Sequence, residues 1–258
     1  MPLNIPLKLN IREGTKTGAV IGDIHFPYHD PRTLRLVEQF LFQLQPDFVI
    51  YNGDLADFYQ VSVFAKDPAR VHMLESDVKM VRSLFRRHRE AMPNTDMVFI
   101  AGTHEYRFQK FMWSSAPELS SLTELTIPEL YRLDKHNIQY IPFEQGLLIN
   151  GIFLVLHGDL VSIHASYTAK RMFEKHGGCG IMNHTHRGGS FYKRDRFGTW
   201  GWWENFCLCD LDPDWTRNPN WVQGFSLIHF TDHKRFYVEQ IPIVDHKFMY
   251  GNEEWSGR

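Results

Sequence analysis

Aspartate and histidine recur in five short segments, each directly after an apolar run. The segments are Asp23-Ile24-His25, Gly53-Asp54-Leu55-Ala56-Asp57, Gly102-Thr103-His104-Glu105, His157-Gly158 and His184-Thr185-His186. Carboxylate and imidazole groups together bind divalent ions such as Mn, Fe or Zn. A carboxylate can bridge two such ions, and an ion pair can hold a phosphoryl group for in-line attack. The five segments therefore predict a two-metal hydrolase.

The order of these segments resembles the calcineurin-like metallophosphoesterase superfamily. Its signature runs D-x-H, GD-x-x-D, GNH-E/D, H and GH-x-H, and this chain reads GDIH, NGDLAD, AGTHEYR, LHGD and NHTHR. The stretch GTHEYRFQK is similar to a phage-type or bacterial branch with poorly defined substrates. The Asp-Arg-Gly continuation typical of the Ser/Thr protein phosphatases is missing after Asp57.

The resemblance implies a role for each matching residue. The first ion would be held by Asp23, His25 and His186. The second would be held by His157 and His184, with Asp54 as the bridge and Thr103 at the remaining ligand position. The resemblance thus implies two divalent ions, manganese first, with iron, zinc, nickel or magnesium as alternatives.

The catalytic roles fall on the third segment. His104 would stand beside the scissile phosphate, where it protonates the leaving oxygen or stabilises its charge, and Glu105 would orient it. Asp54 joins them because it would hold both ions. Asp57 is open: it either supports a metal ligand from behind or caps a turn.

Two positions depart from the family pattern. Thr103 replaces an Asn, and its hydroxyl is shorter by about one bond, roughly 1.5 Å. Metal–oxygen distances tolerate only about ±0.2 Å, so we expect the second ion to bind weakly. Asn183 replaces a Gly, and because Asn tolerates positive φ, we expect it to occupy the same turn.

Candidate substrate contacts lie close to these segments. Arginine can fork onto phosphate oxygens, although a surface salt bridge explains Arg107 nearly as well. Aromatic neighbours favour a phosphodiester that carries an organic group. The predicted substrate-binding residues are Tyr28, Arg107, His164 and Arg187, in a pocket completed by Phe26 and Tyr59.

The elements around the segments alternate between strand and helix. Apolar runs at 18–22, 48–51 and 97–100 predict parallel strands, and periodic patterns at 31–44 and 71–90 predict the helices between them. Parallel strands would bring the segments to one shared edge. Asp30 and Pro31 open the first helix, and Asn150-Gly151 predicts a hairpin. Residues 225–230 and 236–238 read as the final hairpin.

These elements predict an α/β fold, a two-layer β-sandwich of mixed sheets flanked by helices. Residues 1–258 read as a single metallophosphoesterase domain, because no repeat or linker-like stretch interrupts them. Residues 106–135 read as helices that cap the active site.

Bulk properties narrow the class of protein. The net charge of −2 gives no global basic field for long nucleic acid. Three cysteines cannot form a disulfide framework, which favours a reducing compartment. The chain shows no signal-peptide pattern, no apolar run of about 18 residues, no P-loop and no G-x-S-x-G motif. We therefore expect a cytoplasmic enzyme without a membrane span.

Other conspicuous residues have structural interpretations. Cys207 and Cys209 would lie on one face of a strand as buried thiols, and the arginines between 82 and 89 would form a solvated helix face. Trp200, Trp202 and Trp203 suit a core or a homo-oligomer contact better than base stacking.

The sequence thus predicts a binuclear phosphodiesterase that acts on nucleic acid or nucleotides through in-line attack by metal-bound hydroxide. Its partner would be the phosphoester substrate. One alternative is a phosphomonoesterase, including a protein phosphatase. The other is a binding protein that retains the fold but has impaired catalysis because of Thr103.

Overall fold

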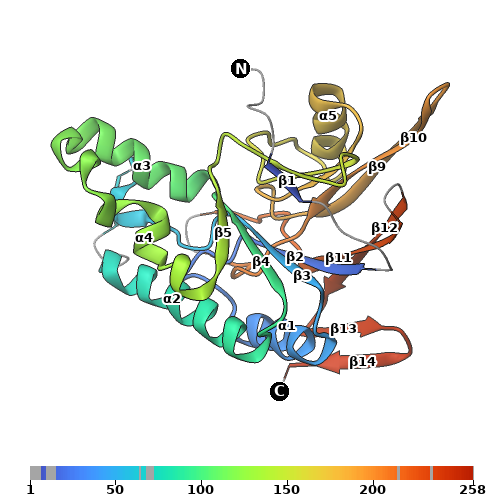
Figure 1. Ribbon diagram of the computed structural model, residues 1–258, viewed down its shortest axis with the longest axis horizontal. Coiled ribbons are helices and arrows are strands. Elements are labelled where there is room, and N and C mark those ends of the chain that lie inside the picture. The colour runs from blue at the N-terminus through green and yellow to red at the C-terminus, as the bar shows by residue number, and fades with distance from the viewer. Residues whose placement is uncertain are drawn as a thin grey trace.

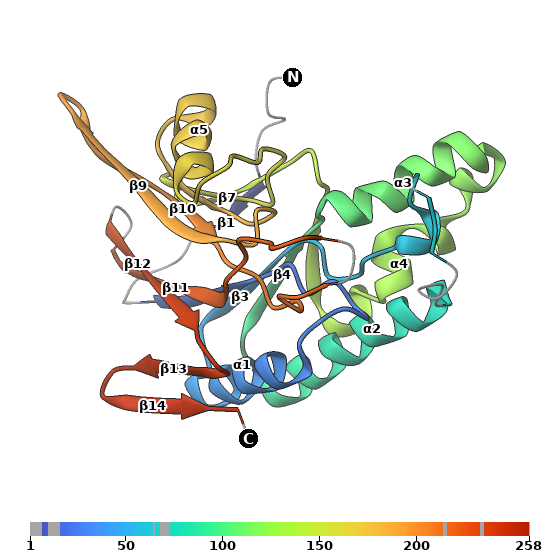
Figure 2. The ribbon, with the colours of Figure 1, turned by 180° about the vertical axis from the view of Figure 1, so that it is seen from behind.

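Two mixed six-stranded sheets pack face to face, with helices on both outer faces (Figures 1 and 2). The computed structural model describes residues 7–9, 16–63, 65–67, 73–213, 216–232 and 235–257. The architecture confirms the predicted α/β sandwich of mixed sheets flanked by helices.

The first sheet, called the β2 sheet, carries the predicted parallel strands. Strands β2 to β5 are parallel, and β11 and β12 add antiparallel strands beside β2. The strand order is β12 (Arg235–Ile243), β11 (Gln223–Asp232), β2 (Lys16–Ile21), β3 (Phe48–Asn52), β4 (Asp96–Ile100) and β5 (Ile138–Ile141).

The second sheet, called the β7 sheet, contains both parallel and antiparallel pairs. Strand β8 lies parallel to β7 and β10, while β6–β7 and β9–β10 are hairpins. The predicted Asn150-Gly151 turn is confirmed, with positive φ at both residues. The strand order is β1 (Leu7–Leu9), β6 (Leu147–Ile149), β7 (Phe153–Leu156), β8 (Cys179–Met182), β10 (Gly198–Asn205) and β9 (Gly188–Asp195).

Helices cover both outer faces of the sandwich. Asp30 caps α1 by accepting hydrogen bonds from the N–H groups of Arg32 and Thr33, as its type predicts. The predicted start of the second helix at residue 71 lies outside the described residues. The helices are α1 (Pro31–Leu44), α2 (Leu74–Ala91), α3 (Thr103–Ser115), α4 (Ile127–Tyr131) and α5 (Tyr167–His176), with 3₁₀ turns η1 (Tyr59–Val61), η3 (Pro117–Ser121), η4 (Thr123–Leu125) and η5 (Asp134–His136).

Strand alternation distributes apolar side chains between separate cores. On β3, Phe48 and Ile50 face the core between the sheets, while Val49 and Tyr51 face the core under α1 and α2. Trp202 and Trp203 are both buried on opposite faces of β10, one under α5 and one between the sheets. Their burial confirms the interpretation of these two tryptophans as core residues.

The predicted final hairpin is real but not final. Strands β13 (Lys247–Tyr250) and β14 (Glu253–Ser256) form another hairpin after it. Gly251-Asn252 between them is a two-residue turn signal that the sequence interpretation missed. Phe248 and Trp255 of this hairpin pack against Phe40 of α1. Among the described helices, none combines the length and apolarity that crossing a membrane requires.

Candidate metal centre

The five Asp- and His-containing segments meet at one end of the sandwich. Three follow β2, β3 and β4 of the β2 sheet, and two follow β7 and β8 of the β7 sheet. Sequence interpretation expected one parallel sheet to deliver all of them. Instead, the segments come from both sheets, because β7 and β8 belong to the opposite layer.

The first ligand set is Asp23, His25 and His186. Their ligand atoms lie within 4.8 Å of one another, and all three side chains are buried. The Nε2 atoms of the two histidines are 3.0 Å apart, and His186 Nε2 lies 3.6 Å from Asp23 Oδ1. Ligands on one ion at about 2.0–2.2 Å stand roughly 3.0–3.6 Å apart, so this set fits a divalent ion.

The second ligand set is Asp54, His157 and His184, again within 4.8 Å. His157 Nδ1 lies 2.7 Å from the carbonyl oxygen of Asn52, which can only accept, so Nδ1 carries the proton. The Nε2 atom then faces Asp54 Oδ2 at 3.1 Å, and on losing its proton this nitrogen would be oriented as a metal ligand. Asp54 Oδ2 is also 4.0 Å from His25 Nε2, which places Asp54 between the two sets.

Backbone conformation aims these side chains at the centre. Left-handed φ values are uncommon for residues other than Gly and cluster at functional sites. Most of the predicted ligands adopt them: Asp23 (48°), His25 (55°), Asp54 (51°), His184 (75°) and His186 (56°).

Burial and neighbouring charge shift the pKa values of the ligands. Burial raises the pKa of Asp23 to about 6, and its Oδ1 atom has no hydrogen-bond partner among the described residues. Burial lowers the pKa of His184 to about 4. Burial opposes the charge on His157, but the Asp54 carboxylate outweighs it and raises the pKa of His157 to about 10. An orphaned carboxylate oxygen among inward-facing imidazoles is what a cation site presents.

Asp57 supports two histidines from behind. Its Oδ2 atom lies 3.3 Å from His25 Nδ1 and 3.4 Å from His104 Nδ1. A carboxylate behind a ligand imidazole fixes the ring and leaves the other nitrogen for a metal. Of the two interpretations left open for Asp57, the contacts favour support of a ligand.

Glu105 is buried and holds the second and third segments together. Its carboxylate accepts hydrogen bonds from the N–H groups of Asp54 (2.9 Å), Leu55 (2.9 Å) and Gly102 (2.8 Å). The Tyr131 hydroxyl lies 3.1 Å from it. The side chain therefore positions the Asp54 loop and the start of α3.

A cavity of about 440 Å³ opens over the candidate centre. His104 Nδ1 lies 2.7 Å from the Asp57 carbonyl oxygen, and Arg107 Nη2 lies 3.1 Å from His104 Nε2. Burial lowers the pKa of His104 to about 4. Sequence interpretation did not place three of the lining residues, Cys209, Asp210 and Trp221, at the cavity. The predicted residues on its wall are His25, Tyr28, Tyr59, His104, Arg107 and His186.

Three predicted pocket residues make their contacts elsewhere. Arg187 donates hydrogen bonds to the carbonyl oxygens of Ser162 and Asn220. His164 contacts the ring of Tyr167, and Phe26 is buried against His29. Each is near a ligand in the sequence, but none is among the residues that line the cavity.

Residues 19–215 match the model of the calcineurin-like phosphoesterase family, about three quarters of the chain. The chain belongs to this family. The match supports a metal-dependent phosphoesterase, and groups of His and Asp that could hold divalent ions are present.

Relatives of this calcineurin-like phosphoesterase include two phage proteins. The Gene 54 proteins of Mycobacterium phages D29 and L5 are each 24% identical to it, over 94% of this chain and 99% of theirs. Among solved structures, Vps29 of Chaetomium thermophilum is 11% identical with a TM-score of 0.48, over 94% of this chain and 96% of that one. Vps29 of Cryptosporidium parvum is 12% identical with a TM-score of 0.49, over 95% and 100%.

Thr103 lies beside the Asp54 carboxylate, the predicted bridge. Its hydroxyl donates a hydrogen bond to Asp54 Oδ2 at 3.0 Å, the oxygen that also faces His157. At the position where the family has Asn, the Thr103 hydroxyl therefore forms a hydrogen bond with the Asp54 carboxylate. A weakened second ion stays a prediction.

Asn183 does not adopt the positive φ expected of a Gly replacement; that conformation belongs to its neighbour His184. Its side chain is buried and donates to Asp23 Oδ2 at 3.1 Å, while its oxygen accepts from Asn52 (2.9 Å) and Asn205 (3.1 Å). The expected positive φ at Asn183 was therefore wrong. The Asn side chain instead makes hydrogen bonds that connect the two sheets, which a Gly at this position could not make.

Proposed function

We propose that this protein is a binuclear phosphodiesterase that acts on nucleic acid or nucleotides. The observation that carries the proposal is a pair of adjacent ligand sets, in which Asp54 of the second set lies 4.0 Å from His25 of the first, beside a cavity lined by His25 and His186. When bound, two divalent ions would activate water and neutralise the phosphoryl oxygens. The first ion would rest on Asp23, His25 and His186, and the second on His157 and His184.

His104 and Arg107 would act on the leaving side of the phosphate. Arg107 donates toward His104 Nε2 at 3.1 Å and toward the Asp57 carbonyl oxygen at 3.0 Å. A phosphoryl group in the cavity would take the guanidinium as a charged donor. His104 Nε2 would then face the leaving oxygen, and the negative charge of the phosphoryl group would raise the lowered pKa of this imidazole, so that it could give a proton to that oxygen or stabilise its charge.

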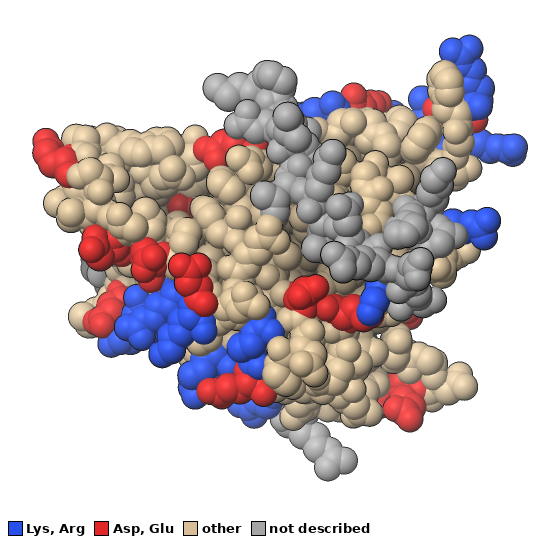
Figure 3. Space-filling model, in the orientation of Figure 1, with Lys and Arg blue, Asp and Glu red and all other residues tan. Residues whose placement is uncertain are grey.

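Two features support a substrate with an organic group. The aromatic residues Tyr28, Tyr59 and Trp221 line the cavity. The β9–β10 hairpin, which begins directly after His186, carries exposed Lys193, Arg194 and Arg196 at its outer end. In Figure 3 basic side chains gather at that end of the molecule. A strand of nucleic acid that leaves the cavity along this hairpin would meet positive charge.

The test is hydrolysis of bis-p-nitrophenyl phosphate with added Mn²⁺ by the unaltered protein and by the His104→Ala variant. We expect the variant to lose about 10²–10⁴-fold in turnover. His229→Ala is the matched control, because His229 pairs with Thr17 at the far end of β2. A rate for the unaltered protein no higher than that of His104→Ala would contradict the proposal.

The same assay addresses the two alternatives. Faster hydrolysis of p-nitrophenyl phosphate than of the diester would favour a phosphomonoesterase. Absence of turnover together with tight Mn²⁺ binding would favour a non-catalytic binding protein. The Thr103–Asp54 hydrogen bond is the observation that supports this second candidate function.

We further propose that residues 1–258 act as one domain. Because the three cysteines are free, we also propose a reducing, cytoplasmic compartment. A homo-oligomer stays a prediction. So does the helical cap at 106–135, which Arg107 connects to the cavity.

A further inference from the structure

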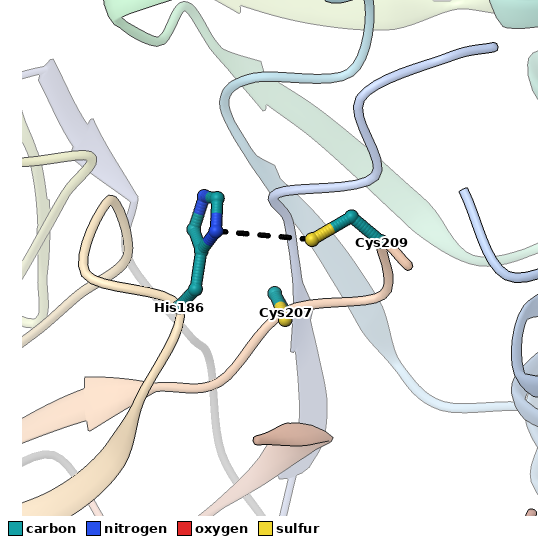
Figure 4. Close-up of side chains that lie close together, drawn as sticks. All are labelled: His186, Cys207 and Cys209. Atoms are coloured by element: carbon teal, nitrogen blue, oxygen red, sulfur yellow. Dashed lines mark hydrogen bonds between the residues drawn. The ribbon is translucent and has the colours of Figure 1, made fainter. Parts of the chain in front are cut away.

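Two thiols and an imidazole nitrogen gather on the side of His186 that faces away from Asp23. Figure 4 shows His186, Cys207 and Cys209 together, with Nδ1 of the imidazole directed at Cys209 Sγ, 3.8 Å away. One ligand atom from each residue lies within 4.8 Å of the others. The opposite ring nitrogen, Nε2, faces His25 and Asp23.

Backbone hydrogen bonds hold the three residues in this arrangement. The Val222 N–H donates to the carbonyl oxygen of His186 at 2.9 Å, and the Cys207 N–H donates to that of Val222 at 3.2 Å. The Leu208 N–H donates to the carbonyl oxygen of Asp23 at 3.1 Å. Because these bonds fix the backbone from three separate segments, the ligand atoms converge without a rearrangement of the chain.

The distances suit a soft ion with tetrahedral ligands. Bonds of about 2.3 Å to sulfur and 2.0–2.1 Å to nitrogen place the two ligand atoms roughly 3.6 Å apart, close to the 3.8 Å between Cys209 Sγ and His186 Nδ1. Thiolates select d¹⁰ ions such as Zn²⁺, Cd²⁺ and Cu⁺ over Mn²⁺ and Mg²⁺. Cys209 and His186 line the cavity of about 440 Å³, which offers access for the ion and room for a fourth ligand.

We propose that Cys207, Cys209 and Nδ1 of His186 form a binding site for a thiophilic metal ion. The site is chemically distinct from the two oxygen- and nitrogen-rich sets, although it shares His186 with the first. Two of its three ligands come from the Cys-x-Cys segment that sequence interpretation treated as buried strand thiols. The proposal concerns metal binding alone and does not depend on any phosphoesterase activity.

The test uses Cd²⁺ added to the full-length chain after treatment with a chelator. We expect an ultraviolet thiolate-to-metal charge-transfer band that saturates at one equivalent. The Cys207→Ser/Cys209→Ser double variant should lose the band and should bind Cd²⁺ at this site more than about 100-fold more weakly. Cys179→Ser is the matched control, because Cys179 opens β8 and contacts the Gly201 N–H instead; it should keep the band.

A second measurement needs no variant. X-ray absorption at the Cd edge of the unaltered protein with one equivalent of Cd²⁺ should show two sulfur neighbours. Only nitrogen and oxygen neighbours, or a charge-transfer band that survives in the double variant, would overturn the site. His186→Gln should keep the band but bind Cd²⁺ about 10-fold or more weakly, and unchanged affinity would remove the imidazole from it.

Discussion

The carboxylate of Asp54, which we predict to bridge the two ions, makes several polar contacts. Its Oδ1 accepts from the His104 N–H at 2.7 Å, and its Oδ2 accepts from the Thr103 hydroxyl at 3.0 Å. The negative charge is thereby held between the start of α3 and His157. Burial opposes this charge, but the neighbouring imidazoles outweigh it and hold the pKa of Asp54 well below its ordinary value.

Thr103→Asn should strengthen binding of the second ion. The longer amide supplies a neutral oxygen ligand and removes the hydroxyl from Asp54 Oδ2, so we expect about 10-fold higher Mn²⁺ affinity by calorimetry. Thr103→Ser, which keeps the hydroxyl, is the control and should leave affinity unchanged. Equal affinities for the Asn variant and the unaltered protein would show that position 103 is not a weakened ligand site.

A second residue-scale feature is the pair of buried Asp77 and half-buried Gln60. The Gln60 amide donates to Asp77 Oδ2 at 3.1 Å, while Asp77 Oδ1 and Gln60 Oε1 have no hydrogen-bond partner among the described residues. Burial raises the pKa of Asp77 to about 6. A proton on Oδ1 would allow the carboxyl group to donate to Gln60 and complete the pair.

Asp77→Asn should therefore change the pH dependence of stability. The folded state holds the Asp77 proton up to about pH 6, whereas the unfolded chain releases it near pH 4. The free energy of unfolding thus falls as pH rises through this window. The variant should flatten that slope and be more stable at pH 8 by about 1–3 kcal/mol in urea denaturation. Exposed Asp134→Asn is the control, and an equal slope in Asp77→Asn would refute the assignment.

At the scale of elements, the start of α3 shows how a helix terminus can build a site. Glu105 in its first turn binds the Gly102 N–H and two amides of the Asp54 loop. A single carboxylate thereby satisfies helix-terminal and loop donors together. On α2, Arg87 pairs with Glu38 of α1 at 2.6 Å, and Arg89 donates to the carbonyl oxygens of Thr95 and His136. These arginines connect elements, which the prediction of a solvated face did not anticipate.

The β9–β10 hairpin is the element best placed to extend substrate contacts. Tyr192 and Phe197 are 60% and 73% exposed there, among the three basic residues of its outer end. We expect the triple variant Lys193→Ala/Arg194→Ala/Arg196→Ala to bind single-stranded oligonucleotides more weakly. The slope of log affinity against log salt concentration should become shallower by about 2, because each of the three lost phosphate contacts contributes roughly 0.7.

The control for this prediction alters exposed basic residues elsewhere, Lys79 and Arg86 on α2. Hydrolysis of bis-p-nitrophenyl phosphate should be unchanged in both variants, because the small substrate does not reach the hairpin. Unchanged oligonucleotide binding by the triple variant would remove the hairpin from the substrate path without affecting the proposed chemistry.

At the scale of the whole molecule, the candidate centre joins two sheets. Three ligand segments belong to the β2 sheet and two to the β7 sheet, and Asn183 links them through Asn52 and Asp23. An ion bound by both sheets would stabilise their packing, because the unfolded chain does not present the ligands together.

Removal of metal should therefore lower the melting temperature. Ions at about 100 times their dissociation constant contribute roughly 2.7 kcal/mol, which corresponds to about 5–10 °C for a chain of this size. Calorimetry with and without chelator measures the shift, and added Mn²⁺ should reverse it. Asp54→Asn is the control that should not respond. An unaltered protein that melts at the same temperature after chelation would exclude a stabilising ion pair.

Sequence alone determined the chemistry of the ligands and their place after apolar strands. These are local properties: Asp23 follows the strand that contains Val20 and Ile21, and a short turn must place it at the strand end. The Asp30 cap and the Asn150-Gly151 turn follow for the same reason, because each depends on neighbours within a few residues.

Only the tertiary structure decided which atoms meet. His25 and His186 are 161 residues apart, and their contact depends on the packing of two sheets rather than on either turn. Tertiary packing also decided that Arg187 binds the Ser162 carbonyl oxygen, that Asn183 forms its hydrogen-bond network, and that Cys207 and Cys209 lie near His186. Periodicity assigns a residue to a strand face, but the neighbour across the layer is set by how the layers pack.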